Sequence, residues 1–317
     1  MTAPLDPKRA GEPSPAPPDP GRAADAGPGG AASGGADMGQ YVEANRRLWE
    51  MWTRVNLASE LYDVEAFAAG RARDLDPVVL AGPGDVRGKS LLHLQCHFGM
   101  DTLRWVRRGA IATGADFSAP AIEAARALSA RMHLPATFVQ SDLYALPEHL
   151  TGAFDVVFTS HGVLGWLPDL DRWARVIAHF LAPGGIFYIV EVHPFAVIFD
   201  DVRTAPGLRL LYPYFHGPEP VREERTGSYA APEGQFTSVE HVWLHRVSDV
   251  IGALARAKLV IESFEEYPYL GWRFFPWMEQ GTDGWWRLPA HSDVPLGAAS
   301  LPLMFSLKAR RPTLGAR

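Results

Sequence analysis

The sequence contains little of three things: cysteine, long apolar runs and positive charge. Its 317 residues include one cysteine, Cys96, so no internal disulfide can form and a reducing compartment is expected. No apolar run reaches the length of a membrane span, and the N-terminal region lacks the basic-then-apolar order of a signal peptide. The net charge of −6 argues against a nucleic-acid partner, which needs a basic surface. We therefore expect a cytoplasmic protein that binds neither membrane nor nucleic acid.

Large apolar side chains are scarce in residues 1–37, which consist mainly of Pro, Gly, Ala, Ser and Asp. Such a composition cannot offset the conformational entropy that is lost on folding, so this segment is predicted to be a disordered tail. The chain as a whole is 47% apolar and 21% charged, which is enough for a substantial core. Residues 38–317 are predicted to form a single domain.

Short apolar runs alternate with helical patterns through this domain. The predicted strands span 90–96, 110–117, 136–142, 154–160, 186–193, 260–270 and 301–310. The predicted helices span 101–109, 118–132, 171–181 and 248–259, after a leading amphipathic helix with Tyr41, Leu48, Trp49 and Trp52 on one face. This alternation is typical of an α/β fold with a parallel sheet covered by helices on both faces. Two irregular segments, at about 194–246 and 271–300, are predicted to be lid insertions.

The loop in LLHLQCHFGM, residues 91–100, follows the first predicted strand. In an open parallel sheet, ligands bind at the carboxyl ends of the strands where the strand order reverses, and the next helix offers its N-terminal N–H groups. Asp116 ends the second strand, about twenty residues after the loop, where an acid suits ribose hydroxyls. Asp142 ends the third strand, where an acid suits an adenine amino group. Together these features predict a nucleotide-type cofactor.

These motifs resemble those of the class I S-adenosylmethionine-dependent methyltransferases. The residues that carry the resemblance are LLHLQCHFG, GADFS, SDLYALP, FDVVFTSHGVLGWL and FLAPGGIFYIVE, within about residues 85–195. The resemblance implies a Rossmann-like, seven-stranded, mostly parallel sheet whose last strand is antiparallel. It also implies methyl transfer from S-adenosyl-L-methionine to an oxygen or nitrogen of a small molecule, with an aromatic or amine compound as the expected acceptor. A non-catalytic S-adenosylmethionine-binding partner subunit and a protein methyltransferase are the alternatives.

The resemblance also implies site residues. The expected cofactor contacts are Gln95, Cys96, His97, Gly99, Asp116, Phe117, Asp142, Leu143, Thr159, Ser160 and Trp49. By the resemblance, the loop after the first strand holds the methionine part, Asp116 the ribose, and Asp142 with Leu143 the adenine. Thr159 and Ser160 line the methyl-donor side. The loop departs from the usual pattern, in which an acid stands at position 93 and glycines at 95 and 97. Gln95, or Asn45 and Trp49 of the leading helix, is therefore expected to hold the cofactor's amino group.

Two histidines are candidates for a general base, because both follow central strands. His161 comes directly after Thr159 and Ser160, and His193 ends the fifth strand. An unperturbed imidazole titrates near neutral pH, although a lone histidine is as often structural as functional. Glu191 shares a strand face with His193 and is a candidate to orient it, with a buried pairing of Glu191 as the equal alternative.

A metal site is the alternative interpretation of the loop after the first strand. His93, Cys96 and His97 are ligand types, but strand alternation is expected to send residues 93, 95 and 97 one way and Cys96 the other. No second cluster stands at zinc-like spacing, so no metal is predicted. A single buried cysteine is more often a packing residue than a nucleophile. The aromatic residues of the two insertions fit either ordinary packing or an apolar acceptor pocket.

Overall fold

The computed structural model describes residues 38–202, 204–289 and 301–313. The predicted disordered tail lies outside these residues, as does the end of the second predicted insertion, residues 290–300. In the part of the chain that is described, no helix has both the length and the apolar character needed to cross a membrane.

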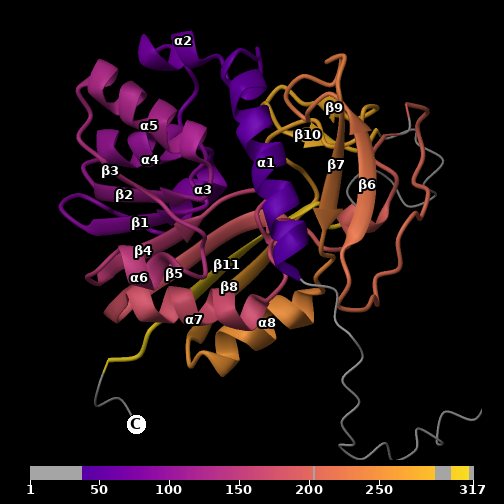
Figure 1. Ribbon diagram of the computed structural model, residues 1–317. Coiled ribbons are helices and arrows are strands. Elements are labelled where there is room, and N and C mark those ends of the chain that lie inside the picture. Colours follow the sequence, from indigo (N-terminus) through magenta and orange to yellow (C-terminus); the bar gives the residue numbers. More distant parts are fainter. Residues whose placement is uncertain (1–37, 203, 290–300, 314–317) are drawn as a thin grey trace, which may run out of the picture. The chain divides into compact units, whose positions relative to one another are not determined.

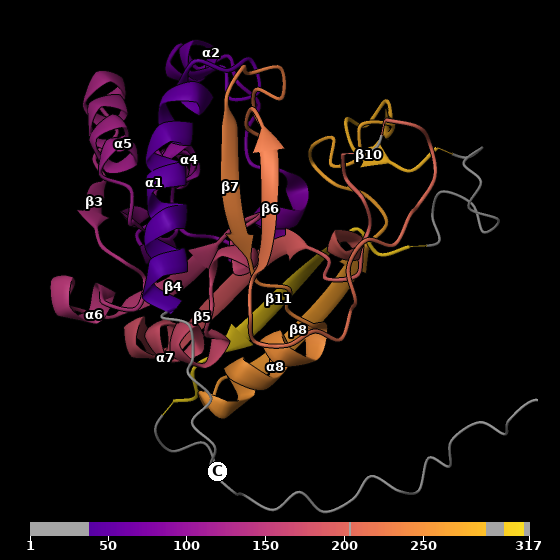
Figure 2. The ribbon, with the colours of Figure 1, turned by 45° about the vertical axis from the view of Figure 1, so that its right-hand side comes forward.

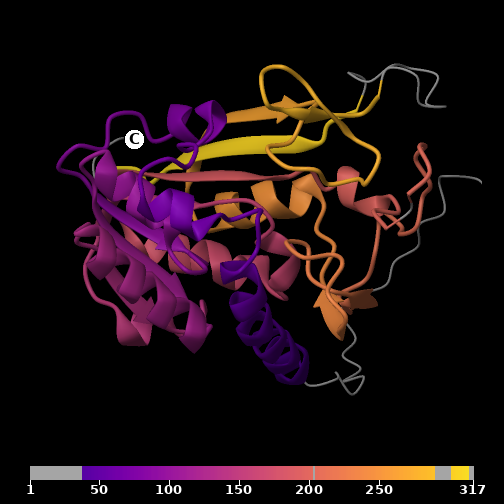
Figure 3. The same cartoon turned by 90° about the horizontal axis from the view of Figure 1, so that it is seen from above.

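A seven-stranded sheet forms the centre of this domain (Figure 1). Its strand order is β3-β2-β1-β4-β5-β11-β8, and only β11 runs antiparallel to its neighbours. The strands are β1 (Ser90–Leu94), β2 (Ile111–Asp116), β3 (Thr137–Gln140), β4 (Phe154–Thr159), β5 (Leu181–Val192), β8 (Val260–Tyr267) and β11 (Met304–Arg310). Figure 3 shows β11 running alongside β5. The predicted sheet, with its antiparallel last strand, is confirmed. Its order reverses between β1 and β4, where a ligand is expected.

Helices cover both faces of the sheet. Figure 1 shows α4 and α5 on one side and α7 and α8 on the other. The helices that follow α1 are α2 (Val64–Ala68), α3 (Pro77–Ala81), α4 (Met100–Arg107), α5 (Ala119–Met132), α6 (Leu146–His149), α7 (Leu170–Phe180) and α8 (Val247–Arg256), with short 3-10 turns η1 (Leu164–Trp166) and η2 (Ala196–Ile198). Ser118 caps α5 as expected, since its side chain accepts from the N–H of Ala121. The two faces of the sheet support separate apolar clusters.

The predicted leading helix is α1 (Met38–Leu57), which packs against α5 and against a hairpin in the first insertion. Figure 2 shows this hairpin, β6 (Val221–Thr226) and β7 (Thr237–Val242), beside α1. Asn45 fixes the contact, because its side chain donates to the carbonyl of His241 at 2.7 Å and accepts from the same residue's N–H at 3.0 Å. Both ends of the Asn45 amide therefore bind the hairpin, a structural role that the sequence did not indicate.

The second insertion contains a small hairpin, β9 (Glu279–Gln280) and β10 (Trp286–Arg287), and lies against the sheet. Phe275 is fully buried and stacks on Trp277 with ring centroids 5.3 Å apart. Trp285 is also buried in the same apolar cluster. For these side chains the packing interpretation holds. Trp272 differs, because its ring meets a candidate site residue that is described below.

The fifth strand begins earlier than predicted. The sequence predicts a helix over 171–181 and a strand from 186, but β5 already begins at Leu181 and includes the segment Pro183-Gly184-Gly185. The pairing of β5 with β4 shifts register between Phe154 and Val156, and Gly184 has a φ of 81°. The Gly-rich segment is thus an irregularity within the strand, which glycine permits at positive φ.

Candidate active site

The loop after β1 has an unusual backbone. Gln95 and His97 have positive φ angles of 53° and 52°, and Gly99, the N-cap of α4, has a φ of 76°. A Cβ atom at Gly99 would lie 2.6 Å from the ring of Phe138 and 2.9 Å from Cβ of Ala125. Only glycine fits there, for both conformational and steric reasons. The loop is therefore held tightly against β3 and α5.

Asp116, at the end of β2, ties this loop to the neighbouring strand. Its Oδ2 accepts from the N–H of His97 and its Oδ1 from the N–H of Ser118, both at 2.9 Å. The residue is 9% exposed, and this burial raises its pKa to about 6 even though the backbone N–H groups lower it. Each carboxylate oxygen still has accepting capacity beyond the one N–H that it receives.

His93 and Gln95 lie in different surroundings. Nδ1 of His93 lies 2.9 Å from Oγ1 of Thr102, and its Nε2 lies 3.4 Å from Oγ of Ser160. Burial lowers the pKa of His93 to about 4, so the ring is neutral. The side chain of Gln95 instead donates to the carbonyl of Val163 at 3.2 Å. The prediction that these side chains point the same way is wrong, because β1 ends at Leu94 and alternation ends with it.

His97 is enclosed by aromatic rings. Its ring centroid lies 5.3 Å from that of Trp49, 5.5 Å from Tyr62 and 4.1 Å from Phe98. Trp49 also meets Trp166, at 5.2 Å. Burial lowers the pKa of His97 to about 3, and its Nε2 has no hydrogen-bond partner among the described residues. The structure thus brings Trp49 of α1 to the loop, together with Tyr62 and Trp166, which the sequence did not single out.

Cys96, between these residues, packs inward. It is 4% exposed, and a Cβ atom at Gly114 of β2 would lie 2.8 Å from its sulfur. Burial raises the pKa of the Cys96 thiol well above its ordinary value, so it remains a neutral packing group. Among the described residues, no three His, Cys, Asp or Glu side chains are grouped as metal ligands.

The ends of β2 and β3 hold the remaining predicted cofactor contacts. Oδ1 of Asp142 accepts from the N–H of Tyr144 at 2.8 Å, which leaves its other oxygen available. Leu143 is 8% exposed, and Phe117, which directly follows Asp116 in the chain, is half-buried. These residues line the same carboxyl edge of the sheet as the loop after β1.

The end of β4 contacts the loop after β1, and the residue that follows Ser160 contacts the segment before α3. The hydroxyl of Thr159 donates to the carbonyl of Leu94 at 3.2 Å, deep in the core. Nε2 of His161 lies 3.5 Å from Oδ2 of Asp76, and its ring meets Trp272 at 4.8 Å. Asp76 was missed by sequence reasoning. The Asp-Pro pair before an apolar run signals a helix start, but not the contact with His161.

Glu191 has a role other than the one predicted. Its carboxylate accepts from the N–H of Val163 at 2.7 Å and of Leu164 at 3.1 Å, and also from Gly162. Burial raises the pKa of Glu191, while these N–H groups lower it. The residue therefore anchors the segment after β4 and does not orient His193, so that prediction is wrong.

His193 is already engaged by protein groups. Its Nδ1 accepts from the N–H of Phe195 at 3.0 Å. Its Nε2 lies 2.9 Å from Oε1 of Glu266, an ion-pair contact with poor hydrogen-bond geometry. Both ring nitrogens thus face protein groups, Nδ1 through a hydrogen bond and Nε2 through the contact with Glu266. Of the two predicted bases, His161 is the one that fits the role better.

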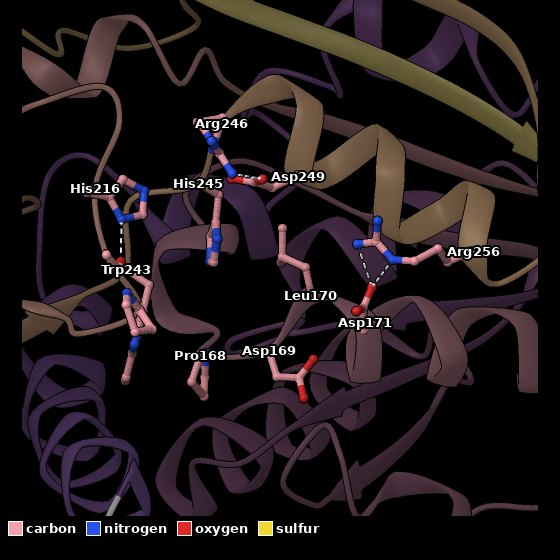
Figure 4. Close-up of a pocket in the computed structure, with 12 residues that line it drawn as sticks. Pro168, Asp169, Leu170, Asp171, His216, Trp243, His245, Arg246, Asp249 and Arg256 are labelled. Carbon is pink, nitrogen blue, oxygen red and sulfur yellow. Dashed lines mark hydrogen bonds and ion pairs between the residues drawn. The ribbon is translucent and has the colours of Figure 1, made fainter. Parts of the chain in front are cut away.

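A separate pocket of about 310 Å³ lies beside the starts of α7 and α8 (Figure 4). Four of its charged side chains form two pairs, Arg246 with Asp249 and Arg256 with Asp171, each at 2.7 Å. His216, Trp243 and His245 complete one wall. None of the predicted site residues lines this pocket.

Part of the chain is similar to known proteins. Residues 92–187 match the family model described as a methyltransferase domain. A ubiquinone biosynthesis O-methyltransferase from Alkalilimnicola ehrlichii is 29% identical over 130 residues, which cover 40% of this chain and 52% of that protein. A malonyl-[acyl-carrier protein] O-methyltransferase from Pseudescherichia vulneris is 31% identical over 128 residues, which cover 40% and 47%. The chain thus spans about half the length of the curated relatives it matches.

A solved structure of an S-adenosylmethionine-dependent methyltransferase from Mesorhizobium loti is 21% identical, with a TM-score of 0.44; the match covers 72% of this chain and 93% of that one. The family match covers β1 through β5, with the loop after β1 at the point where the strand order reverses. The family match of this segment and the order of the sheet support a class I S-adenosylmethionine-dependent methyltransferase.

Proposed function

We propose that this chain transfers a methyl group from S-adenosyl-L-methionine to an oxygen or nitrogen of a small molecule. When bound, the cofactor supplies a methyl group on a positively charged sulfur. The protein's own part is to hold the cofactor, bring the acceptor into contact, exclude water and take a proton where the acceptor has one to lose.

The bridge from Asp116 to the backbone of His97 is the observation that carries this proposal. It joins the ends of β1 and β2, next to the point where the sheet order reverses between β1 and β4, and it leaves a buried carboxylate with spare acceptor capacity. Two adjacent ribose hydroxyls match such a carboxylate. We assign Asp116 to the ribose, and Asp142 with Leu143 to the adenine.

The loop also fits the methionine part of the cofactor. Oε1 of Gln95 is a buried acceptor that has no partner among the described residues, and an ammonium group needs such an acceptor. His93 cannot replace the usual acid there, because its ring is neutral and bonds to Thr102. We therefore assign the amino group to Gln95. The faces of Trp49 and Trp166 next to the loop suit the positive sulfur.

The acceptor is the least constrained part of the proposal. The names of both curated relatives describe transfer to oxygen, which supports an oxygen acceptor here. One of those names refers to a small-molecule pathway and the other to a carrier protein, so the family alone does not choose between these acceptors. The aromatic side chains near His161 support an apolar or aromatic small molecule.

Labelled cofactor and a panel of small metabolites test the proposal. The purified chain is incubated with both, and mass spectrometry follows the appearance of a methylated product. A product that gains one methyl group supports the proposal. Cofactor binding without any transfer, and without slow cofactor breakdown, would instead indicate a non-catalytic partner subunit. Label transferred only to added protein would indicate a protein methyltransferase.

A further inference from the structure

His161 meets two segments that lie far from it in the sequence. Its Nε2 lies 3.5 Å from Oδ2 of Asp76, which directly precedes α3. Its ring lies edge-on to Trp272 of the second insertion, with the ring centroids 4.8 Å apart. Both side chains of this contact are largely shielded, 18% and 16% exposed. The contact between His161 and Asp76 therefore lies away from the open surface.

The Asp76 carboxylate is held in place by α3. Its Oδ1 accepts from the N–H of Val79 at 2.8 Å and caps the helix, which leaves Oδ2 for His161. Burial by itself would raise the pKa of Asp76, but His161 and the N–H groups of Val79 and Val78 lower it below its ordinary value. The carboxylate is therefore ionised and fixed at neutral pH.

Nδ1 of His161 is the ring nitrogen that remains. It is buried and has no hydrogen-bond partner among the described residues. A carboxylate that accepts from Nε2–H fixes the tautomer in which Nδ1 carries the lone pair. The ring thus presents one basic nitrogen, directly after the strand end where Thr159 and Ser160 lie.

We infer that Asp76 is a positioning residue that orients His161 as the base for the acceptor, and that the acceptor atom is a hydroxyl oxygen. This inference rests on the proposed methyl transfer and names the acceptor class of the same site. Asp76 acts through His161 and contacts neither cofactor nor acceptor.

The proton and electron pairs balance in this step. The acceptor oxygen forms a bond to the methyl carbon as the carbon–sulfur bond breaks, and the electron pair of that bond stays on sulfur. The hydroxyl proton passes to Nδ1 of His161, and the resulting imidazolium is stabilised by the carboxylate of Asp76. Solvent removes the proton after the product has left.

A hydroxyl benefits from this arrangement more than other acceptors do. An ionised carboxylate has no proton to lose. A neutral amine attacks through its lone pair and can release its proton to water afterwards. A hydroxyl is a weak nucleophile until its proton leaves, so a positioned base accelerates its reaction by about 10²–10⁴-fold. The buried dyad therefore favours the hydroxyl.

The first test uses the cofactor-free protein. Nitrogen-15 NMR of the histidine rings reports the tautomer of His161, assigned with His161→Gln. We expect the Nε2–H tautomer in the wild type and a shift towards the Nδ1–H tautomer in Asp76→Asn, because the amide NH₂ that replaces Oδ2 would donate to Nε2. Among the described residues, the phenols of Tyr188 and Tyr269 also interact with Asp76, and both keep their protons at neutral pH.

Asn also caps helices well, so Asp76→Asn should fold. Asp63→Asn is the matched control, because Asp63 caps α2 through the N–H of Ala66, far from this ring in the chain. It should leave the His161 tautomer unchanged. The same tautomer in Asp76→Asn and wild type, or an Nδ1–H tautomer in wild type, would overturn the inference.

The second test measures turnover with a hydroxyl acceptor. Asp76→Asn should lower kcat on the order of 10²-fold, with cofactor affinity and acceptor KM nearly unchanged, and the loss should be partly recovered at higher pH. Asp76→Glu should recover part of it at neutral pH. An unchanged kcat in Asp76→Asn would contradict the positioning role. Failure of the wild type to bind S-adenosylmethionine would instead contradict the proposed function, whatever the NMR result.

Discussion

The backbone N–H of His97 donates a 2.9 Å hydrogen bond to Oδ2 of Asp116 and so joins the ends of β1 and β2. This bond supports the left-handed conformation of His97, which has a φ of 52°. The left-handed conformation is sterically unfavourable for a residue other than glycine, so the surrounding contacts must hold His97 in place. Asp116 therefore shapes the loop as well as offering acceptors to a ligand.

Gly99 should tolerate no side chain. Gly99→Ala combines a left-handed φ with contacts as short as 2.6 Å to Phe138, so we expect it to lose about 2–5 kcal/mol of unfolding free energy. Gly84→Ala is the control, because Gly84 also has a positive φ of 66° but its Cβ would meet nothing within 4 Å. It should lose only about 1–2 kcal/mol. Equal losses in urea denaturation would contradict the close packing of the loop.

Glu191 should stabilise the segment after β4. In Glu191→Ala the N–H groups of Gly162, Val163 and Leu164 lose their acceptor inside the protein, which should cost about 1–3 kcal/mol of unfolding free energy. Glu191→Gln keeps one acceptor and should lose less. Glu265→Ala, on the exposed side of β8, is the control. Urea denaturation that finds Glu191→Ala as stable as this control would contradict the anchoring role.

Glu240 should make the stability of the first insertion depend on pH. It is 4% exposed, and it shares Arg225 with Asp201 and Glu223, whose carboxylates lie 2.9 and 2.7 Å from the guanidinium. Burial raises the pKa of Glu240 to about 7, while Arg225 lowers it and the other two acids raise it. The raised pKa means that the folded protein keeps a proton that the unfolded chain releases.

The sign of the effect follows from this difference. Below about pH 4.5 both states are protonated and the stabilisation is complete; it is lost as the pH rises to about 7, by at most about 1.4 kcal/mol per pH unit. Glu240→Gln should flatten this fall, whereas Glu224→Gln on the exposed side of β6 should not. Thermal unfolding between pH 4.5 and 8 measures the pH dependence of stability in both variants and in the wild type. A fall of the same steepness in wild type and Glu240→Gln would contradict this assignment.

The seven strands and the antiparallel last strand could be predicted from the sequence, because apolar runs and family motifs are signals carried by short stretches of the chain. The alternation of strand and helix and the capping Ser118 are local signals of this kind. The hydrogen bond between Asn45 and His241, by contrast, joins residues 196 positions apart, and no short sequence pattern indicates it. The same holds for Asp76 and His161, which only the folded chain brings together.

The direction of the side chains in the loop after β1 also had to come from the structure. A strand pattern that continues past Leu94 puts residues 93, 95 and 97 on one side. Positive φ angles at Gln95 and His97 break that pattern, and nothing in the letters QCH indicates them, since glycine usually holds such positions. Glu191 was misassigned for a related reason: its partners are backbone N–H groups, which no sequence pattern shows.

Calorimetric titration with S-adenosyl-L-methionine tests the central claim most directly. The wild-type protein should bind one cofactor molecule per chain. Asp116→Ala should lose on the order of 1.5–3 kcal/mol of binding free energy, because charge-assisted hydrogen bonds to the ribose disappear. Asp155→Ala should bind normally, since Asp155 accepts from the N–H and hydroxyl of Ser90 at the opposite end of the strands. Absence of binding by the wild type, or full affinity in a folded Asp116→Ala, would contradict the account.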